Sequence, residues 1–227
     1  MCAILAAAGR GARMGQPKQL LELAGKPLAA WSLATIASVP AVTQIVVACE
    51  SDERSSFERL GANVGCGKVQ RVVSGGARRQ DSVFAALRAL SSPAELVLVH
   101  DGARPFVSTE VLVSVIEQAR EHGGAIAAVP VKDTIKQVSD SGTVHKTIPR
   151  AHLWAAQTPQ AFSYELLFRA HENAEADGFM GTDDAELVER LGGATIAIVE
   201  SSYENLKITT PEDLIVAERI AAGRANR

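Results

Sequence analysis

The chain has 227 residues, of which 47% are hydrophobic, so it can bury a large core and is not expected to be disordered. Its 23 Lys and Arg against 26 Asp and Glu give a formal net charge of −3, which offers no bulk attraction for nucleic acid or an anionic membrane surface. No apolar stretch approaches the ~20 residues of a membrane span, and the three scattered cysteines fit neither a disulfide framework nor a zinc site. These features predict a cytoplasmic globular protein.

Short runs of apolar and β-branched residues recur along the chain. Most are apolar at successive positions, a pattern typical of strands that are buried on both faces. The predicted strands are residues 3–7, 44–48, 69–73, 95–100, 125–129 and 195–199.

Stretches of helical periodicity lie between these runs. In residues 81–90 the apolar side chains recur at helical spacing, and residues 111–119 behave similarly, with Ser108 as a plausible N-cap. Because strands alternate with helices, the sequence predicts an α/β fold, a doubly wound and mostly parallel sheet covered on both faces. No linker or repeat interrupts it, so residues 1–227 are expected to form one domain.

Residues 132–150 break the alternation. Two stretches of alternating polar and apolar residues flank the turn sequence Ser-Asp-Ser-Gly, which predicts a β-hairpin. A hairpin inserted into a doubly wound sheet cannot easily bury both of its faces on its own domain. We therefore expect an arm that docks on a second subunit, and the alternative is a flap over the domain's own cleft.

Residues typical of helix starts and ends also occur toward the C-terminus. Thr182 precedes two aspartates, so a capping hydroxyl and two carboxylates are expected at a helix N-terminus, and Gly192 with Gly193 is expected to end that helix. Thr210 followed by Pro211 and two acidic residues predicts the start of the last helix.

The segment after the first predicted strand combines glycines with cations. Its glycines allow tight turns that bring backbone N–H groups toward an anion, and no carboxylate occurs before Glu22. The segment matches neither the dinucleotide fingerprint, because position 14 is Met, nor the P-loop, because Gln19 replaces the hydroxyl residue. Nucleotide-phosphate binding is predicted, against the alternative of an ordinary tight turn. The residues concerned are Gly9, Arg10, Gly11, Arg13, Gly15 and Lys18.

Asp101 directly follows a buried strand. A carboxylate at the carboxyl end of such a strand is well placed to hold Mg²⁺ on phosphate oxygens, although its position alone is equally compatible with an aspartate that caps the next turn. The neighbouring His100 is interpreted as structural, because a phosphate nucleophile is already ionised near pH 7 and needs no general base.

Six separated segments resemble one enzyme family over essentially the whole chain. The resemblance is to the nucleotidyltransferases that transfer a nucleoside monophosphate from a triphosphate to a sugar phosphate. Within them it is closest to the CTP-dependent 2-C-methyl-D-erythritol 4-phosphate cytidylyltransferases of non-mevalonate isoprenoid synthesis. It implies a Rossmann-like nucleotidyltransferase fold and a homodimer joined through the arm. The segments are residues 7–19, 75–83, 100–105, 130–134, 156–160 and 204–209.

The resemblance also implies a role for each matching residue. Arg13, Lys18 and Lys207 would stabilise the triphosphate during transfer, because fixed positive charge suits the charge that develops on its oxygens. Asp101 would hold Mg²⁺, and a second ligand would come from Glu204, one methylene longer than the aspartate often found there. The CTP-binding set would comprise Ala7, Ala8, Gly9, Gly11, Arg13, Lys18, Gly75, Gly76, Ser82, Asp101 and Gly102.

The acceptor, a small polyol phosphate, would bind residues from two subunits. Thr134 and Arg150, which flank the hairpin, would reach the acceptor phosphate from the partner subunit. The residues of the same chain that would contact it are Arg104, Thr158, Thr182 and Lys207. One departure from the family is Ala77, where many relatives carry an acidic residue next to the cytosine-binding turn.

Other functions remain open at this point. A ribitol-5-phosphate cytidylyltransferase would carry nearly the same motifs and would differ in the acceptor pocket. A non-catalytic CTP sensor is disfavoured because Arg13, Lys18, Asp101 and Lys207 are all present. A dehydrogenase is disfavoured because the glycine spacing does not match the dinucleotide fingerprint.

Overall fold

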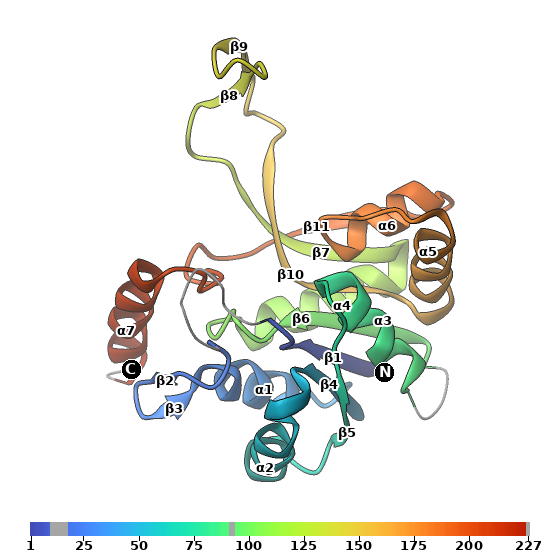
Figure 1. Ribbon diagram of the computed structural model, residues 1–227, viewed down its shortest axis with the longest axis vertical. Coiled ribbons are helices and arrows are strands. Elements are labelled where there is room, and N and C mark those ends of the chain that lie inside the picture. The colour runs from blue at the N-terminus through green and yellow to red at the C-terminus, as the bar shows by residue number, and fades with distance from the viewer. Residues whose placement is uncertain (10–17, 91–93, 226–227) are drawn as a thin grey trace.

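The computed structural model describes residues 1–9, 18–90 and 94–225 (Figure 1). Seven strands form one sheet in the order β11-β7-β10-β6-β1-β4-β5. All six predicted strands belong to it, each within two residues of its predicted ends. The strands are β1 (Cys2–Ala6), β4 (Gln44–Cys49), β5 (Val69–Ser74), β6 (Leu96–Asp101), β7 (Gly123–Pro130), β10 (Trp154–Ser163) and β11 (Thr195–Glu200).

The sheet is mostly parallel. β1 pairs in parallel with β4 and β6, β4 pairs with β5, and β11 pairs with β7. The exception is β10, which lies between β6 and β7 and is antiparallel to both. This strand was not predicted, because its sequence shows no clean alternation of polar and apolar residues.

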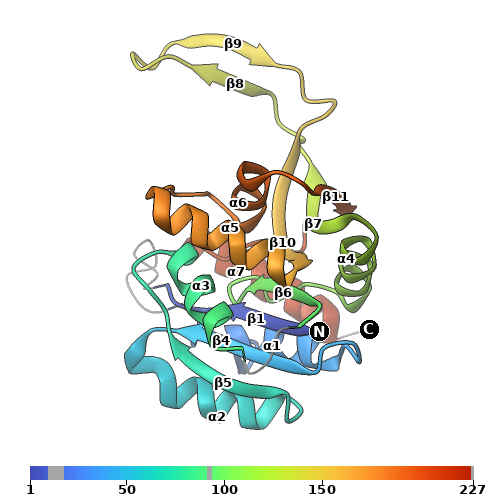
Figure 2. The same ribbon diagram turned by 90° about the vertical axis from the view of Figure 1, so that its right-hand side faces the viewer.

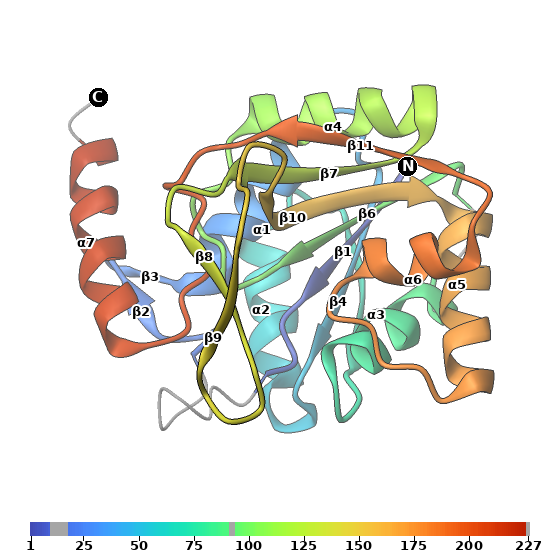
Figure 3. The ribbon, with the colours of Figure 1, turned by 90° about the horizontal axis from the view of Figure 1, so that it is seen from above.

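Helices cover both faces of the sheet, as predicted. Alternate residues of β1 face opposite sides, so Ala3 and Leu5 belong to one hydrophobic cluster and Ile4 and Ala6 to the other. Figure 3 shows α4 on one side of the sheet and α5 and α6 on the other. The first cluster is covered by α1 (Leu28–Ser38), α2 (Arg54–Val64), which follows the short helix η2 (Ser51–Glu53), and α4 (Thr109–His122). The second is covered by α3 (Arg79–Arg88), α5 (Tyr164–Asp177) and α6 (Asp184–Leu191).

A smaller unit closes one end of the molecule. The short strands β2 (Glu22–Leu23) and β3 (Lys26–Pro27) pack near the last helix, α7 (Pro211–Ala225), around a third hydrophobic cluster. This cluster includes Leu23 from the N-terminal side and Ile208 from the C-terminal side, both fully buried. It therefore packs the segment around Leu23 against the C-terminal segment beside the sheet.

The strand order reverses next to β1. The chain first builds outward from β1 through β4 to β5 and then returns to place β6 on the other side of β1. In α/β sheets, ligands bind outside the carboxyl ends of the strands at such a switch point. Here the carboxyl ends are Ala6 of β1 and Asp101 of β6, which lie side by side in register.

The structure confirms three of the helix-terminus predictions and corrects one. The Ser108 hydroxyl accepts a hydrogen bond from the Val111 N–H at the start of α4, Gly192 ends α6, and Thr210 caps α7. The N-cap of α6 is Asp183, whose carboxylate accepts from the Glu186 N–H, and not Thr182. The hydroxyl of Thr182 instead donates to the Glu186 carboxylate, because a carboxylate one position later reaches the helix N–H groups better.

The predicted hairpin is present and projects from the body as an arm. It consists of β8 (Ile135–Val138) and β9 (Val144–Ile148), antiparallel strands that form a separate two-stranded sheet. Figures 1 and 2 show that the arm points away from the seven-stranded sheet. Near its tip, Val138 and Val144 are 59% and 62% exposed, which leaves apolar surface uncovered.

None of the helices in the described residues has the length and apolar character needed to cross a membrane.

Candidate active site

Two adjoining cavities lie at the switch point. The first, of about 200 Å³, is lined by five of the residues predicted to bind CTP: Ala8, Gly9, Lys18, Ser82 and Asp101. The second, of about 110 Å³, is lined by four of the residues predicted to bind the acceptor: Arg104, Thr158, Thr182 and Lys207. Lys207 and Asp101 line both cavities. The fold thus brings together nine of the predicted site residues, from segments far apart in the sequence.

Asp101 is the centre of an ion-pair cluster. Its carboxylate is 6% exposed, and each of its two oxygens faces a cation. Oδ1 accepts a hydrogen bond from Arg79 Nε at 2.8 Å, and Oδ2 lies 2.6 Å from Lys207 Nζ. Asp101 is the last residue of β6, and it lines both cavities together with Arg79 and Lys207. The end of this strand therefore carries a group of charges that the two cavities share.

The electrostatics of Asp101 follow from these contacts. Burial alone would raise the pKa of its carboxyl, but the charges of Arg79, Lys207 and Arg104 outweigh burial and hold that pKa well below its ordinary value. Burial also opposes the charge on Arg79, yet Asp101 and Asp184 raise the pKa of its guanidinium. Asp101 and Arg79 are therefore both ionised at neutral pH.

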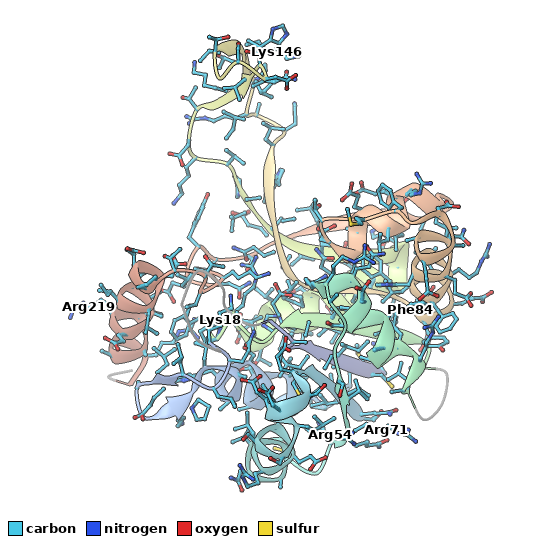
Figure 4. All side chains as sticks on the ribbon, viewed as in Figure 1. Lys18, Arg54, Arg71, Phe84, Lys146 and Arg219 are labelled. Carbon is cyan, nitrogen blue, oxygen red and sulfur yellow. The ribbon has the colours of Figure 1, made fainter. Side chains whose placement is uncertain are left out.

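Lys18 is buried between α7 and the sheet (Figure 4). Its ammonium donates to the Ile208 carbonyl at 2.8 Å, one residue after Lys207. This contact fixes the lysine against the C-terminal segment and leaves its side chain on the wall of the first cavity. Lys18 and Lys207 thus reach the same cavity from opposite ends of the chain.

Close packing explains the glycine pair after β5. A Cβ atom on Gly75 would lie 2.2 Å from the Ala8 Cβ, and one on Gly76 would lie 2.3 Å from the Asp81 Cβ. Ser82 completes the turn, since its hydroxyl accepts from the Gly76 N–H and donates to the Arg78 carbonyl. The absence of side chains brings the backbone of this turn directly beside Ala8 in the wall of the first cavity.

Gly102, directly after β6, is also closely packed. Its N–H donates to the Ala6 carbonyl at 2.9 Å, which ties the two strand ends together. A Cβ atom here would come within 2.9 Å of the Gln19 side-chain oxygen and within 3.4 Å of the Ala7 Cβ. The predicted residues Ala7 and Gly102 therefore support the cavity from behind and do not line it.

Thr158 and His100 support the second cavity. The Thr158 hydroxyl accepts from the Asp101 N–H at 2.9 Å and lies 3.2 Å from His100 Nδ1, while His100 Nε2 lies 3.1 Å from the Arg104 carbonyl. Burial lowers the pKa of the His100 imidazole to about 4. With a neutral ring that donates from Nε2, the hydroxyl of Thr158 gives its proton to Nδ1. This arrangement supports the interpretation of His100 as a structural residue.

Arg104 spans the second cavity. Its Nη1 donates to the Asn205 carbonyl at 2.7 Å, and its Nε is buried without a hydrogen-bond partner among the described residues. The residue itself lines the second cavity, which is compatible with the predicted role of Arg104 toward the acceptor.

Some predicted residues lie elsewhere. The Glu204 carboxylate does not join Asp101, because it pairs with Arg224 at 3.2 Å and lines neither cavity. Thr134 and Arg150 lie at the base of the arm, both exposed, and neither lines either of these two cavities. Gly11 and Arg13 lie outside the described residues.

Two groups of positioning contacts were missed from the sequence. Arg79 stands next to Arg78 in the glycine-rich segment, and nothing in the sequence distinguishes the inward arginine from the outward one. Asn205 is buried, and its amide donates to Gln157 Oε1 and to the Thr158 carbonyl, which holds β10 against the segment that carries Lys207. The sequence places Asn205 in a matching segment but gives no partner for it.

The residues fit a divalent cation held jointly with a phosphate ligand. Within the described part of the chain, no group of three or more His, Cys, Asp or Glu side chains could enclose a metal ion. Asp101 offers a single carboxylate at a strand end, surrounded by cations that can themselves meet phosphate oxygens. Mg²⁺ is commonly bound in this way, through one or two carboxylates and the substrate's phosphates.

A larger hollow, of about 540 Å³, lies elsewhere, between α2 and the edge strand β5. Arg54 and Arg71 flank it (Figure 4), and Arg54 is paired with Glu58. None of the residues predicted for the site lines it. The convergence of charges at the switch point, and not cavity size, therefore identifies the candidate active site.

A doubly wound sheet with lysines, arginines and one aspartate gathered at its switch point defines an α/β protein built to bind phosphorylated ligands. Comparison with known proteins narrows this class. The family model for 2-C-methyl-D-erythritol 4-phosphate cytidylyltransferase matches residues 1–222. The chain belongs to this family.

Curated relatives and solved structures agree with the family match. The chain is 51% identical to the 2-C-methyl-D-erythritol 4-phosphate cytidylyltransferase of Shouchella clausii, over 99% of this chain and 98% of the relative. It is 49% identical to that of Geobacillus kaustophilus, over 98% and 97%. The crystal structure of 4-diphosphocytidyl-2C-methyl-D-erythritol synthase from Anaerococcus prevotii superposes with a TM-score of 0.88 at 34% identity, covering 97% of this chain and 95% of that one. The predicted fold and family are thereby confirmed.

Proposed function

We infer that this chain transfers the CMP unit of CTP to 2-C-methyl-D-erythritol 4-phosphate, giving 4-diphosphocytidyl-2-C-methyl-D-erythritol and pyrophosphate in non-mevalonate isoprenoid synthesis. The family match over residues 1–222 carries this conclusion. The site supports it, because two lysines from opposite ends of the chain and a carboxylate meet at the switch point where α/β folds bind nucleotides.

The cations are proposed to bind the triphosphate and stabilise the transition state. When a phosphate oxygen attacks the α-phosphorus and pyrophosphate leaves, negative charge gathers on the oxygens around that phosphorus. Lys18 is held on the cavity wall by the Ile208 carbonyl, and Lys207 is held by Asp101, so both charges are in place before substrate arrives. Arg13, on the same loop as Lys18, is proposed to contribute a third charge.

The chain needs no general base for this reaction. A phosphate monoester has a second pKa near 6, so the acceptor's oxygen is already a nucleophile at neutral pH. His100 directly precedes Asp101 in the sequence, but both of its ring nitrogens are hydrogen-bonded within the protein, and burial lowers its pKa to about 4. Catalysis would then consist of orientation and fixed charge.

Asp101 is proposed as the protein ligand of Mg²⁺. When bound, the cation would neutralise phosphate oxygens of the nucleotide and favour departure of pyrophosphate. Glu204 is not included, because its carboxylate is paired with Arg224. Asp101 Oδ2, now paired with the more exposed Lys207, is the oxygen that can change partner.

The cytosine is proposed to lie against the Gly75–Gly76 turn and Ser82. The turn brings backbone groups beside Ala8, and backbone N–H and C=O groups can distinguish the exocyclic amine of cytosine from the oxygen of uracil. In this arrangement the replacement of an acidic residue by Ala77 leaves nucleotide choice unchanged, since Ala77 is exposed.

The acceptor is proposed to occupy the second cavity, with its phosphate completed by a partner subunit. Arg104 and Thr158 line that cavity, whereas Thr134 and Arg150 stand on an arm that points away from it. Two copies of the chain could exchange arms, so that each arm reaches the other subunit's cavity. The exposed valines of the arm would then be covered by the partner.

A direct assay tests this function. The purified protein is incubated with Mg²⁺, CTP and either 2-C-methyl-D-erythritol 4-phosphate or D-ribitol 5-phosphate, and pyrophosphate release and product mass are measured. We expect rapid turnover with the methylerythritol substrate and slow turnover with ribitol 5-phosphate. Faster turnover with ribitol 5-phosphate would reassign the acceptor, and UTP replacing CTP with equal rates would contradict the proposed base site.

A further inference from the structure

One arginine connects the site to the interior of the protein. The Arg79 guanidinium, 25% exposed, lies between two carboxylates: its Nε donates to Asp101 Oδ1 at 2.8 Å, and its Nη2 lies 2.8 Å from Asp184 Oδ2. Asp101 and Asp184 belong to different elements, β6 and α6, so Arg79 ties the sheet edge to a helix on its face.

The far end of this connection is rigidly held. Asp184 is 1% exposed and stands at the start of α6, where the Gln160 side chain accepts hydrogen bonds from its N–H and from that of Ala185. Its Oδ1 lies 3.3 Å from the fully buried His171 Nε2. Because Asp184 is buried at the start of α6, its ion pair with Arg79 anchors the guanidinium on the side away from Asp101.

At the Asp101 end of this connection lie the cavities proposed for both substrates. Arg79, Asp101 and Lys207 are the three residues that line both the first and the second cavity. A guanidinium fixed at Asp184 therefore sets the position of the Asp101 carboxylate at the boundary where the two substrates would meet. A displacement of about 1 Å at such a point is enough to reduce a rate ~10²-fold.

The two cations on Asp101 differ in how firmly they are held. Arg79 has two carboxylate partners and a planar head, whereas Lys207 is 37% exposed, with Asp101 as its only ion-pair partner among the described residues. The lysine can therefore leave Oδ2 for a phosphate oxygen more easily than the arginine can leave Oδ1.

We propose that Arg79 is a positioning residue for the transfer reaction: anchored by Asp184, it holds Asp101 by one carboxylate oxygen and leaves the other free to exchange Lys207 for a cation that arrives with the nucleotide. The proposal rests on the function proposed above. It assigns to Arg79 no contact with substrate, because its Nε and Nη2 both face carboxylates.

A double-mutant cycle tests the proposal. Arg79→Ala should lower kcat on the order of 10- to 100-fold and change the KM for CTP less than about threefold, because the residue acts on orientation and not on binding. In an Asp101→Asn background, measured by single-turnover kinetics, the same substitution should change the rate less than about twofold, since the two residues act as one unit. Methylguanidine should restore part of the activity of Arg79→Ala and none of that of Asp101→Asn.

Three further measurements separate positioning from folding. Arg88→Ala is the matched control, because Arg88 lies on the same helix and pairs with an exposed carboxylate, Glu175, away from both cavities; its kcat should be unchanged. If Arg79→Ala unfolds, Arg79→Lys keeps the charge but cannot bridge both carboxylates, and the same kcat loss is expected. In ¹⁵N-arginine NMR spectra, the Arg79 Nε–H signal should remain protected when Mg²⁺ and CTP are added, and should lose protection in Asp184→Asn.

The outcomes discriminate between the two proposals. A rise in the KM for CTP that matches the fall in kcat would show that Arg79 binds the nucleotide directly and would overturn the positioning role. A full Arg79→Ala effect in the Asp101→Asn background would overturn it as well, while leaving the proposed function intact. Wild-type activity of Asp101→Asn alone would remove the proposed role of Asp101, and with it that of Arg79.

Discussion

The ammonium of Lys18 donates a hydrogen bond to the backbone carbonyl of Ile208, 2.8 Å away and 190 positions later in the chain. Ile208 follows Lys207, whose own ammonium pairs with Asp101. The contact therefore places two lysines from opposite ends of the sequence on one cavity. It also joins the proposed site to the third hydrophobic cluster, which contains Ile208 and Leu23.

Lys18→Ala should lower kcat on the order of 10²–10³-fold, because it removes a fixed charge from the oxygens that become more negative during transfer. The fold should persist, since the hydrophobic cluster that contains Ile208 remains intact. Steady-state kinetics and a thermal melt of the same sample measure both quantities. A variant with a wild-type melt and kcat within twofold of wild type would remove Lys18 from the mechanism.

Arg150→Ala should raise the KM for the acceptor at least tenfold more than the KM for CTP, as expected for a lost charge-assisted contact to phosphate. The reason is that Arg150 stands on the arm and lines neither cavity of the candidate site in its own chain. Initial-rate kinetics with each substrate varied in turn measure the two constants.

Mixing subunits tests whether that contribution comes from the partner. Lys18→Ala and Arg150→Ala proteins are unfolded together, refolded and assayed at an acceptor concentration far below the KM of Arg150→Ala, where each variant alone is nearly inactive. If the arm acts in trans, hybrid dimers contain one intact site, and activity should recover to about a quarter of wild type. Equal impairment of both KM values, or no recovery on mixing, would speak against an arm that crosses the interface.

Gly75→Ala should raise the dissociation constant Kd of CTP about tenfold or more, because the new Cβ would lie 2.2 Å from the Ala8 Cβ and 2.7 Å from the Ser82 hydroxyl, so the wall of the first cavity must shift. Gly223→Ala serves as control, since a Cβ there has nothing within 4 Å. Calorimetric titration with CTP measures both. Unchanged affinity in Gly75→Ala would mean that the base binds elsewhere.

His100 should make stability depend on pH. Its pKa is lowered from 6.5 to about 4 by burial, so below pH 6.5 the unfolded chain binds a proton that the folded chain does not. The stabilisation is complete above pH 6.5 and is lost as the pH falls toward 4, by about 3 kcal/mol in total. Urea unfolding from pH 7.5 to 4.5 should show this loss in wild type and not in His100→Gln; parallel curves for the two proteins would show that His100 does not titrate in this range.

The sequence predicts the framework of this protein better than its contacts. Buried apolar runs and helical periodicity locate six strands and the flanking helices, because these patterns are local. The antiparallel β10 escapes prediction, since its place between β6 and β7 depends on segments more than 20 residues away. Two of its polar residues contact the ends of other elements: Gln160 accepts a hydrogen bond from the start of α6, and Thr158 accepts one from the end of β6. The strand therefore lacks the alternation of polar and apolar residues by which a strand is predicted.

The candidate site likewise contains residues that the sequence predicts and contacts that it does not. Lys18, Asp101 and Lys207 are found from their motifs, but the ion pairs that hold them are not. Whether Arg78 or Arg79 faces inward depends on where α3 begins: Arg78 becomes its N-cap and pairs with Asp81, and only then does Arg79 point to Asp101. A shift of one residue in that helix start would exchange the two roles.

The central claim is that the cations at the switch point bind the triphosphate of CTP. A crystal structure of the protein with CTP and Mg²⁺ tests it most directly. We predict phosphate oxygens within hydrogen-bond distance of Lys18 and Lys207, and the cytosine against Gly75 and Ser82. Nucleotide bound instead in the hollow between α2 and β5, or an empty switch point at saturating CTP, would contradict the account.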